Sequence, residues 1–539
     1  MHAALEIPEI VQAVFGQIDH SPQSIGGYDL DIRTLAVLAR TCSAFCDPAL
    51  DLLWAEQRDL GALMGCFPNG LFVEVETPLL RLTENDNSGE GAVLKAVPGR
   101  TVKDLHMRRP ITGGDWERPL VYSHRVKTLH LDNTSVAGIK SASTSAFYDV
   151  CLALPGSHLF PNLRDLRISL FFSFPEMQCD RVVPFLLAPN IERIKIFLKK
   201  SDRASHILPT LAERCPSIAY LDISCWDDAD AERHAASVLI QQLRHLQELC
   251  VKNLNQAAFE YLRRLPTLTA LLVERHTTNL LVDDDETDSF SSLKSLEFGE
   301  TTLDRLMEFM KVIRKCPLER FEARNVEEST ATTEMVVRLF STLAGQCPHT
   351  SLRTIEYYAR IFSNPPSEPT DYVLTGQTLR PLFCFMSMVH VTLYRLSGID
   401  LTDDDVFELA SAWPRLELLS LGGFNHVPSR VTLHALSVFA RCCPRLASLS
   451  LALNASLVPD NSADIPPQHL MEYIYLGRAV ITAPARVAQY VAAMFPATKV
   501  NAWANLEADA PRNVQERVYH DRWQIVQEHL VAIRSLNNN

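Results

Sequence analysis

Glycine is scarce in this chain, which has 20 glycines among its 539 residues. The sequence also lacks Gly-x-x-x-x-Gly-Lys-Ser/Thr, Gly-x-Ser-x-Gly and His-Glu-x-x-His, the short signatures of phosphate loops, hydrolase nucleophiles and zinc hydrolases. The histidines are scattered along the chain. We therefore expect no enzyme activity, no catalytic residue and no cofactor.

Positive charge is also in short supply. Lys and Arg number 51 against 64 Asp and Glu, which gives a net charge of −13. A general nucleic-acid binder needs an excess of Lys and Arg to neutralise phosphates, so we expect no nucleic-acid partner. No apolar run approaches ~18 residues and the first residues lack a signal-peptide pattern, so we expect no membrane span and a cytoplasmic or nuclear location.

Cysteine pairs of metal-binding spacing are missing too, since no Cys-x-x-Cys occurs among the 13 cysteines. Cys215, Cys316, Cys347 and Cys443 each precede a proline at the same place in a repeated pattern. Repetition explains these positions without convergence on an ion. The spacing favours buried, reduced thiols over a zinc site or a disulfide framework.

What the chain does contain is a repeat of the form Pro-x-Leu-x-x-Leu-x-Leu. Copies begin at Phe160, Ala188 and Cys215, at spacings of 28 and 27 residues. The end of each copy alternates apolar and polar residues, which is typical of a half-buried strand. Amphipathic helices are expected between the strands, at Leu303–Lys315, Glu334–Gln346, Asp403–Ala412, Leu433–Cys442 and Ala485–Met494.

This pattern resembles the leucine-rich repeat family in its longer version, which has a full helix on the convex side, over roughly residues 120 to 503. The resemblance implies an α/β fold, with a curved solenoid built from a parallel sheet and outer helices. We expect that solenoid at residues 125–503, a C-terminal helix or tail at 504–539, and a connecting segment at 61–124. A three-helix module is expected at residues 1–60.

The module opens with Ile7-Pro8-Glu9-Ile10 and closes with Leu53-Trp54, a pattern that resembles an F-box. Segments such as Met107–Ile111 and Tyr122–Lys127 resemble the connecting part of fungal F-box proteins with leucine-rich repeats. The resemblance implies that the module docks on a Skp-type adaptor. The candidate adaptor-binding residues are Ile7, Pro8, Ile10, Val14, Phe15, Ile18, Leu35, Leu38 and Trp54; which of them instead hold the helices together stays open.

By the same resemblance the chain would be the substrate-recognition subunit of an SCF-type (Skp–cullin–F-box) ubiquitin ligase. The adaptor would connect the chain to a cullin scaffold, and the repeats would bind a protein target for ubiquitin-dependent degradation. The alternative is a leucine-rich-repeat scaffold for protein–protein interaction that acts outside a ligase. The residues expected to face outward are Asp165, Arg167, Arg193, Lys195, Tyr220 and Asp222 on the early strands, and Glu297, Arg320, Glu322 and Glu356 on the more acidic middle strands. The candidate target-binding residues among them are Arg167, Arg193, Lys195 and Tyr220. The alternative is a solvated strand face without a dedicated site.

Overall fold

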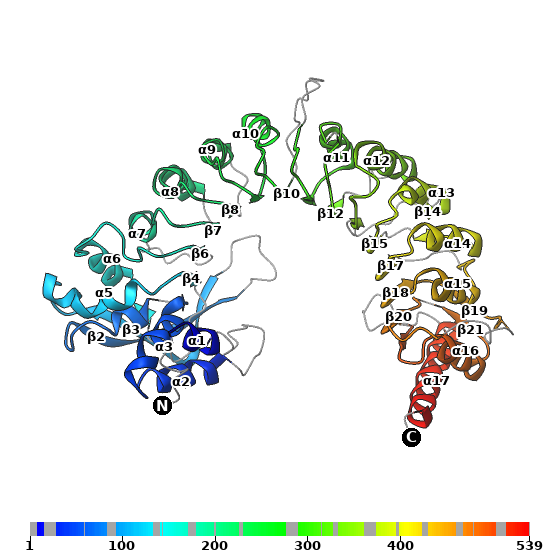
Figure 1. The fold of residues 1–539 in the computed structure, drawn as a ribbon, viewed down its shortest axis with the longest axis horizontal. Coiled ribbons are helices and arrows are strands. Elements are labelled where there is room, and N and C mark those ends of the chain that lie inside the picture. Colours follow the sequence, from blue (N-terminus) through cyan, green and yellow to red (C-terminus); the bar gives the residue numbers. More distant parts are fainter. Residues whose placement is uncertain are drawn as a thin grey trace. The chain divides into compact units, whose positions relative to one another are not determined.

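The chain forms two compact units, Met1–Leu249 and Cys250–Asn539. The computed structural model describes residues 8–15, 28–58, 60–83, 93–132, 141–142, 144–170, 179–198, 201–225, 230–275, 289–313, 315–326, 332–359, 373–394, 398–422, 429–459, 467–477, 479–502 and 514–537. Figure 1 shows that, within each unit, the helices that alternate with the parallel strands lie on the outer side of those strands.

The first unit begins with three helices, α1 (Pro8–Phe15), α2 (Tyr28–Leu38) and α3 (Ser43–Ala55). Val11, Phe15 and Ala49 form a small buried core between them. The rings of Phe15 and Phe45 meet edge to face, with their centroids 5.4 Å apart. The predicted three-helix arrangement is therefore found in the described part of this region.

The third helix is followed directly by a strand. α3 ends at Ala55, and the next two residues form the short strand β1 (Glu56–Gln57). The cause is pairing, because β1 runs parallel to β4 (Thr128–Asp132) and the backbone N–H of Lys127 donates to the carbonyl of Ala55 at 2.9 Å. Tertiary contact thus ends the helix earlier than its sequence would.

The connecting segment contains an antiparallel hairpin that the sequence analysis missed. Its strands are β2 (Phe72–Thr83) and β3 (Val93–Met107), and β5 (Ser141–Ala142) adds to β3 in parallel. The short elements around it are α4 (Gly61–Met64), η2 (Gly113–Trp116) and α5 (Glu117–Ser123).

Parallel strands alternate with helices through the rest of the first unit. The strands follow in the order β1, β4, β6 (Asp165–Leu170), β7 (Arg193–Leu198) and β8 (Tyr220–Cys225). The division between the two units falls within the next strand, β9 (Glu248–Val251). The helices are α6 (Thr144–Leu152), α7 (Cys179–Leu186), α8 (Ser201–Arg214) and α9 (Asp230–Ile240).

The second unit continues the same alternation. Its sheet runs β10 (Ala270–Arg275), β11 (Ser295–Glu300), β12 (Arg320–Val326), β13 (Thr354–Ala359), β15 (His390–Tyr394), β17 (Leu418–Gly422), β18 (Ser448–Leu451), β20 (Tyr473–Tyr475) and β22 (Lys499–Asn501). Two further pairs of short strands are β14 (Leu374–Thr375) with β16 (Ile399–Asp400) and β19 (Asn454–Ala455) with β21 (Val480–Ile481). The helices are α10 (Gln256–Leu262), α11 (Leu303–Met310), α12 (Thr333–Gln346), α13 (Gly376–Leu379), η5 (Arg380–Cys384), α14 (Asp403–Ala412), α15 (His434–Cys442), α16 (Pro484–Met494) and α17 (Val514–Asn537).

The repeated leucines form the core in both units. In the copy that begins at Phe160, the consensus positions Leu163, Leu166 and Ile168 are at most 3 % exposed. The same holds for the copies that end at Ile223, Leu421 and Leu451. Each strand buries these side chains against the helix and strand of its neighbours, which is the burial expected of stacked repeats. The predicted α/β fold of parallel strands with outer helices is confirmed.

A backbone contact repeats along with the core. The carbonyl of the residue just before a strand accepts hydrogen bonds from two successive N–H groups of the next repeat. Lys127 accepts from residues 164 and 165 in this way, Arg164 from 192 and 193, and Arg353 from 389 and 390. This double acceptor fixes the register of neighbouring strands.

Helix ends in the second unit follow the predictions closely, with one exception. α14 has the predicted bounds, whereas α11 stops at Met310 instead of reaching Lys315. The buried residues Val312 and Ile313 pack in the turn after α11, and Lys315 adopts a φ of 57°, which a helix cannot contain. Packing therefore shortens this helix.

The predicted amphipathic helix near the C-terminus is α17. Trp523, Val526 and Leu530 are buried along one side of it, and the Trp523 indole N–H donates to the carbonyl of Ala479 at 2.9 Å. This helix therefore packs on the last repeats of its unit. None of the described helices combines the length and the apolar composition that crossing a bilayer requires.

We predict that Gly299→Ala lowers the free energy of unfolding by about 1–3 kcal/mol. A Cβ at Gly299 would lie 2.1 Å from the backbone carbonyl oxygen of Glu274 on the neighbouring strand, so the strands must shift apart. The matched control is Gly345→Ala in α12, where a Cβ meets nothing within 4 Å and should add about 0.4–1 kcal/mol. Urea unfolding followed by circular dichroism measures both, and a Gly299→Ala midpoint at or above the parent value would contradict the packing described.

Candidate functional site

Two kinds of surface are candidates for binding, and the first is the helical module α1–α3. Val14 on α1 and Val37 on α2 are exposed, at 51 % and 56 %. Phe15 and Leu35 are buried, and Leu38 packs half-buried against the small core. Among the predicted adaptor residues whose side chains the structure describes, Val14 is exposed, while Phe15 and Leu35 are buried and hold the helices together.

Four of the predicted residues of the module have no described side chain. Ile7 and Ile18 lie outside the described residues. Pro8 and Ile10 have a described place in the backbone of α1 only, Ile10 one helical turn before Val14. Val37 was not among the predicted residues. It lies on α2, two residues after Leu35, and its exposure is known only from the structure.

Trp54, at the end of α3, packs against the connecting segment. Its ring stacks on that of Tyr122, with centroids 4.6 Å apart and 25° between the planes. Beside it, the Arg125 guanidinium pairs with Asp47 at 2.6 Å and with Asp51. These contacts join α3 firmly to the segment that leads into the repeats, so Trp54 serves the joint between module and repeats.

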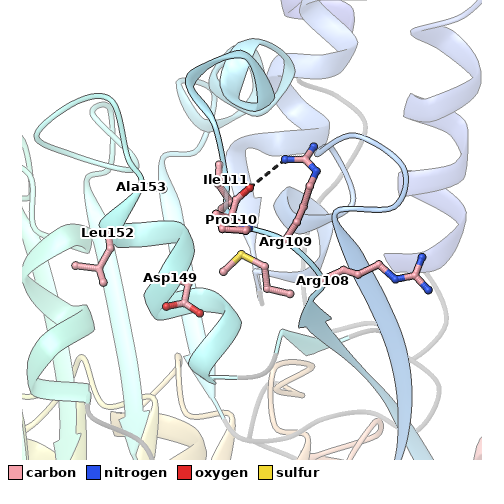
Figure 2. Close-up of a pocket in the computed structure, with 8 residues that line it drawn as sticks. Arg108, Arg109, Pro110, Ile111, Asp149, Leu152 and Ala153 are labelled. Carbon is pink, nitrogen blue, oxygen red and sulfur yellow. Dashed lines mark hydrogen bonds between the residues drawn. The ribbon is translucent and has the colours of Figure 1, made fainter.

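The connecting segment borders a hollow of about 540 Å³, between residues 107–111 and the end of α6. Figure 2 shows the guanidinium groups of Arg108 and Arg109 turned away from Asp149. Arg109 is occupied by Asp115, with two donor–acceptor distances of 2.8 Å, and this contact holds the pKa of the Asp115 carboxyl well below its usual range. Ligand sites need polar groups that converge, and this hollow does not provide them.

The second kind of surface is the face of the strands that points away from the helices and toward solvent, which is the outward face meant below. In the first unit the predicted target residues lie on three adjacent strands, Arg167 on β6, Arg193 and Lys195 on β7, and Tyr220 on β8. Arg167 is in register with Lys195, and Arg193 with Tyr220. The structure therefore brings all four predicted residues together.

Two carboxylates, which were expected on the outward face but not among the target-binding residues, lie among these cations. Arg167 donates to both oxygens of Asp165, at 3.2 and 2.9 Å. The Nζ atom of Lys195 lies 2.6 Å from Asp222. The face is therefore a set of ion pairs with a surplus of one positive charge, because three cations meet two carboxylates.

The second unit has the opposite surplus on β11, β12 and β13. Glu297, Glu322 and Glu356 stand in register on these strands. Arg324 pairs with Glu322 and, at 3.3 Å, with Glu297, while Arg320 reaches Glu356 at 3.5 Å. Three carboxylates share two guanidinium groups, so this face carries one excess negative charge. This agrees with the acidic character that the sequence predicted for the middle strands.

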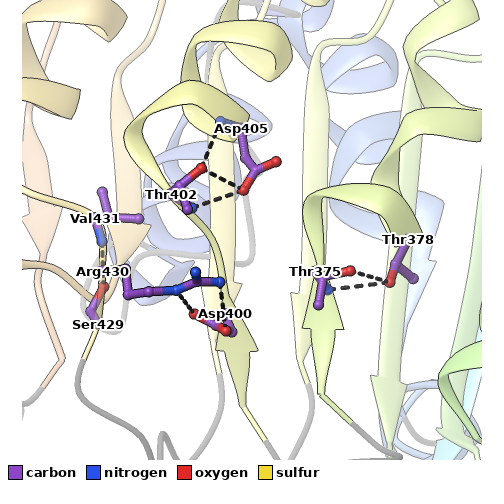
Figure 3. Close-up of polar contacts among 8 residues, drawn as sticks. All are labelled: Thr375, Thr378, Asp400, Thr402, Asp405, Ser429, Arg430 and Val431. Carbon is purple, nitrogen blue, oxygen red and sulfur yellow. Dashed lines mark hydrogen bonds and ion pairs between the residues drawn. The ribbon is translucent and has the colours of Figure 1, made fainter.

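Polar contacts at the starts of the helices clamp neighbouring repeats in the second unit. Figure 3 shows Arg430 reaching across to Asp400, and the two donor–acceptor distances are both 2.8 Å. Thr402 and Asp405 form the capping box of α14, in which the backbone N–H of Asp405 donates to the Thr402 hydroxyl at 3.2 Å. Because these polar groups are all paired within the fold, we assign them a structural role.

The cysteines at the repeated proline turns are buried thiols, as predicted. Burial raises the pKa of Cys215, Cys316, Cys347 and Cys443 to about 12. These thiols are therefore protonated and unreactive at neutral pH. Among the described residues, no three His, Cys, Asp or Glu side chains are grouped as metal ligands.

We predict that Glu297→Gln stabilises the chain at pH 8 and that this gain disappears near pH 4. Burial, and next the Glu322 carboxylate, raise the pKa of Glu297. The folded chain then binds more protons than the unfolded chain between the two pKa values, so this residue's contribution to stability falls as pH rises through that interval. Glutamine does not titrate and avoids the loss.

Urea midpoints at both pH values test this prediction. Glu308→Gln, on the exposed side of α11, controls for removing a surface carboxylate. The same effect of Glu297→Gln at pH 4 and pH 8, or destabilisation at pH 8, would contradict the prediction and show that the ion pair with Arg324 fully compensates the carboxylate.

No family description matches the chain, and no curated protein matches it. Solved structures do match. A chain of the yeast Rad7 and Elc1 complex is 15% identical, with 65% of this chain and 80% of that chain covered, at a TM-score of 0.38. An internalin (inlF) from Listeria monocytogenes is 14% identical, covering 65% and 82%, at 0.32. The plant peptide hormone receptor RGFR1, in complex with RGF2, is 10% identical, covering 71% and 69%, at 0.29. At these TM-scores the likeness carries no argument about function.

Proposed function

We propose that the chain is the substrate-recognition subunit of an SCF-type ubiquitin ligase in the cytoplasm or nucleus. Helices α1–α3 would dock on a Skp-type adaptor that connects to a cullin scaffold, and the repeats would bind the protein target. The chain itself would carry out no bond chemistry. It would act by holding target lysines near the ubiquitin-carrying enzyme of the ligase, which raises their effective concentration.

One observation supports this proposal above the others. A helical module with its own small core precedes the repeats, and it leaves Val14 and Val37 exposed. Fully burying one valine against a partner yields about 1.5–3 kcal/mol, so a few such residues can hold an adaptor. The sequence of this module is the part that resembles an F-box.

The joint to the repeats supports the same proposal. Trp54 stacks on Tyr122, Arg125 pairs with two aspartates of α3, and β1 continues α3 into the sheet. A receptor of this kind benefits from a stiff joint, because a bound target then keeps a fixed place relative to the adaptor.

A second candidate is a leucine-rich-repeat scaffold that acts outside a ligase. It is favoured by the same joint, since β1 is the first strand of the sheet and α3 lies directly before it. In that case α1–α3 would serve only to close the end of the sheet. Adaptor binding distinguishes the two candidates.

We predict that Val14→Glu lowers capture of a Skp-type adaptor by at least about tenfold, because docking would bury a charge. Val37→Glu tests the other exposed valine of the module. The measurement is co-purification of adaptor and cullin with the full-length chain from a fungal extract, together with titration of the purified adaptor.

The matched control is Val121→Glu on α5. Val121 is 53 % exposed against 51 % for Val14 and lies in the same unit, but outside the module. Phe15 is unsuitable for this test, since it is a core residue whose replacement would unfold the helices. Adaptor capture that is absent in the parent, or that survives both substitutions in the module, would favour the scaffold.

A further inference from the structure

The outward face of β4, β6, β7 and β8 has a layered arrangement of charge. His130, Arg167, Lys195 and Asp222 are in register across the four strands. Arg193 and Tyr220 occupy the adjacent row with Asp165. Neighbouring strands lie about 4.8 Å apart, so the charged groups form one continuous patch, termed here the β6–β8 patch.

The cations of the β6–β8 patch are exposed and its carboxylates are covered. The side chains of Arg167, Arg193 and Lys195 are 46–51 % exposed, whereas those of Asp165 and Asp222 are 16 % and 4 % exposed. A partner that approaches this face therefore meets guanidinium and ammonium groups first. The carboxylates lie beneath them as counter-ions.

Several contacts hold the cations in place. Arg167 uses two of its N–H groups on Asp165, and Arg193 lies 4.0 Å above the centre of the Tyr220 ring and 4.0 Å from Asp165. Ser224 donates to Asp222 at 3.0 Å, which keeps that carboxylate under Lys195. Side chains fixed in this way lose less conformational entropy when they bind a further group.

The imidazole of His130 adds no charge to the patch at neutral pH. Burial, followed by the Arg167 charge, lowers the pKa of His130, so this imidazole is neutral at pH 7. Three cations over two carboxylates leave a surplus of one positive charge. The glutamate row of the second unit, with three carboxylates and two arginines, has the reverse surplus.

We propose that the β6–β8 patch binds an extended, acidic segment of the target protein, rich in Asp and Glu. The inference rests on the proposed role as a substrate receptor, for which it names the class of target. Side-chain carboxylates of the segment would accept hydrogen bonds from the exposed guanidinium groups of Arg167 and Arg193 and from the exposed ammonium group of Lys195.

Two substitutions with opposite expected signs test the proposal. Arg193→Gln removes a cation without leaving a carboxylate unpaired, because Arg167 keeps Asp165, and it should weaken binding about fivefold. Asp222→Asn removes the counter-ion that competes for Lys195, and it should strengthen binding about threefold. A general loss of structure cannot produce a gain, so the second variant separates recognition from folding.

The probe is a fluorescein-labelled peptide of eight residues with alternating Ala and Glu, titrated with the full-length chain at low salt and followed by anisotropy. Peptides with Gln, Lys or phosphoserine in place of Glu are the comparisons. Arg415→Gln, an exposed arginine on a turn of the second unit, is the control and should stay within twofold of the parent. Higher salt should weaken binding of the Glu peptide.

The proposal is overturned if the Gln or Lys peptide binds as well as the Glu peptide, or if both substitutions shift affinity in the same direction. Binding of the phosphoserine peptide alone would also overturn it and assign the patch to phosphate. Adaptor capture is measured on the same variants. In the parent chain, failure to bind the Glu peptide with adaptor capture intact contradicts only this inference, while peptide binding without adaptor capture contradicts only the ligase role.

Discussion

No single repeat of this chain can bury its own apolar residues, and the rest of the structure depends on that constraint. The consensus leucines and isoleucines of a strand are covered only when the next strand and helix pack beside them. Stacking therefore proceeds in one direction with a fixed register, reinforced by the carbonyl before each strand that accepts two N–H groups. Alternate residues on every strand must then face outward, and these are the residues available for binding.

Stacking also gives the outward charges their particular environment. Carboxylates on a strand face are covered by longer Lys and Arg side chains. Asp222 is covered by Lys195 of the neighbouring strand, and Glu322 by Arg324 of its own strand. The result in each unit is a face where guanidinium groups are exposed and most carboxylates are not. A count of charges along the sequence cannot represent this difference in depth, although it governs what a partner meets.

Much of the fold could be predicted from the sequence, because the repeat fixes both the period and the apolar face. The bounds of α14 and the capping box of Thr402 with Asp405 are examples where local sequence is sufficient. The β2–β3 hairpin was missed, although Phe72-Val-Glu-Val-Glu-Thr alternates in the manner of a strand. β1 was missed because a long-range partner, β4, decides the conformation of Glu56 and Gln57.

The candidate sites were predicted only in part. Helical periodicity groups Val14 and Phe15 together as apolar residues, and packing alone decides that Val14 is exposed and Phe15 is buried. Trp54 fits the F-box pattern, yet its ring is occupied by Tyr122 from a segment that no local pattern connects to it. Strand alternation placed Arg167, Arg193, Lys195 and Tyr220 on one face together with Asp165 and Asp222, but it did not indicate that the two carboxylates are paired and lie beneath the cations.

The central claim is that the helical module, and not the repeats, receives the adaptor. Hydrogen–deuterium exchange of the full-length chain, alone and with a saturating Skp-type adaptor, tests it most directly. The account predicts slower exchange confined to α1 and α2, with β6, β7 and β8 unchanged. Protection on the strands, or no protection in the module, would contradict it.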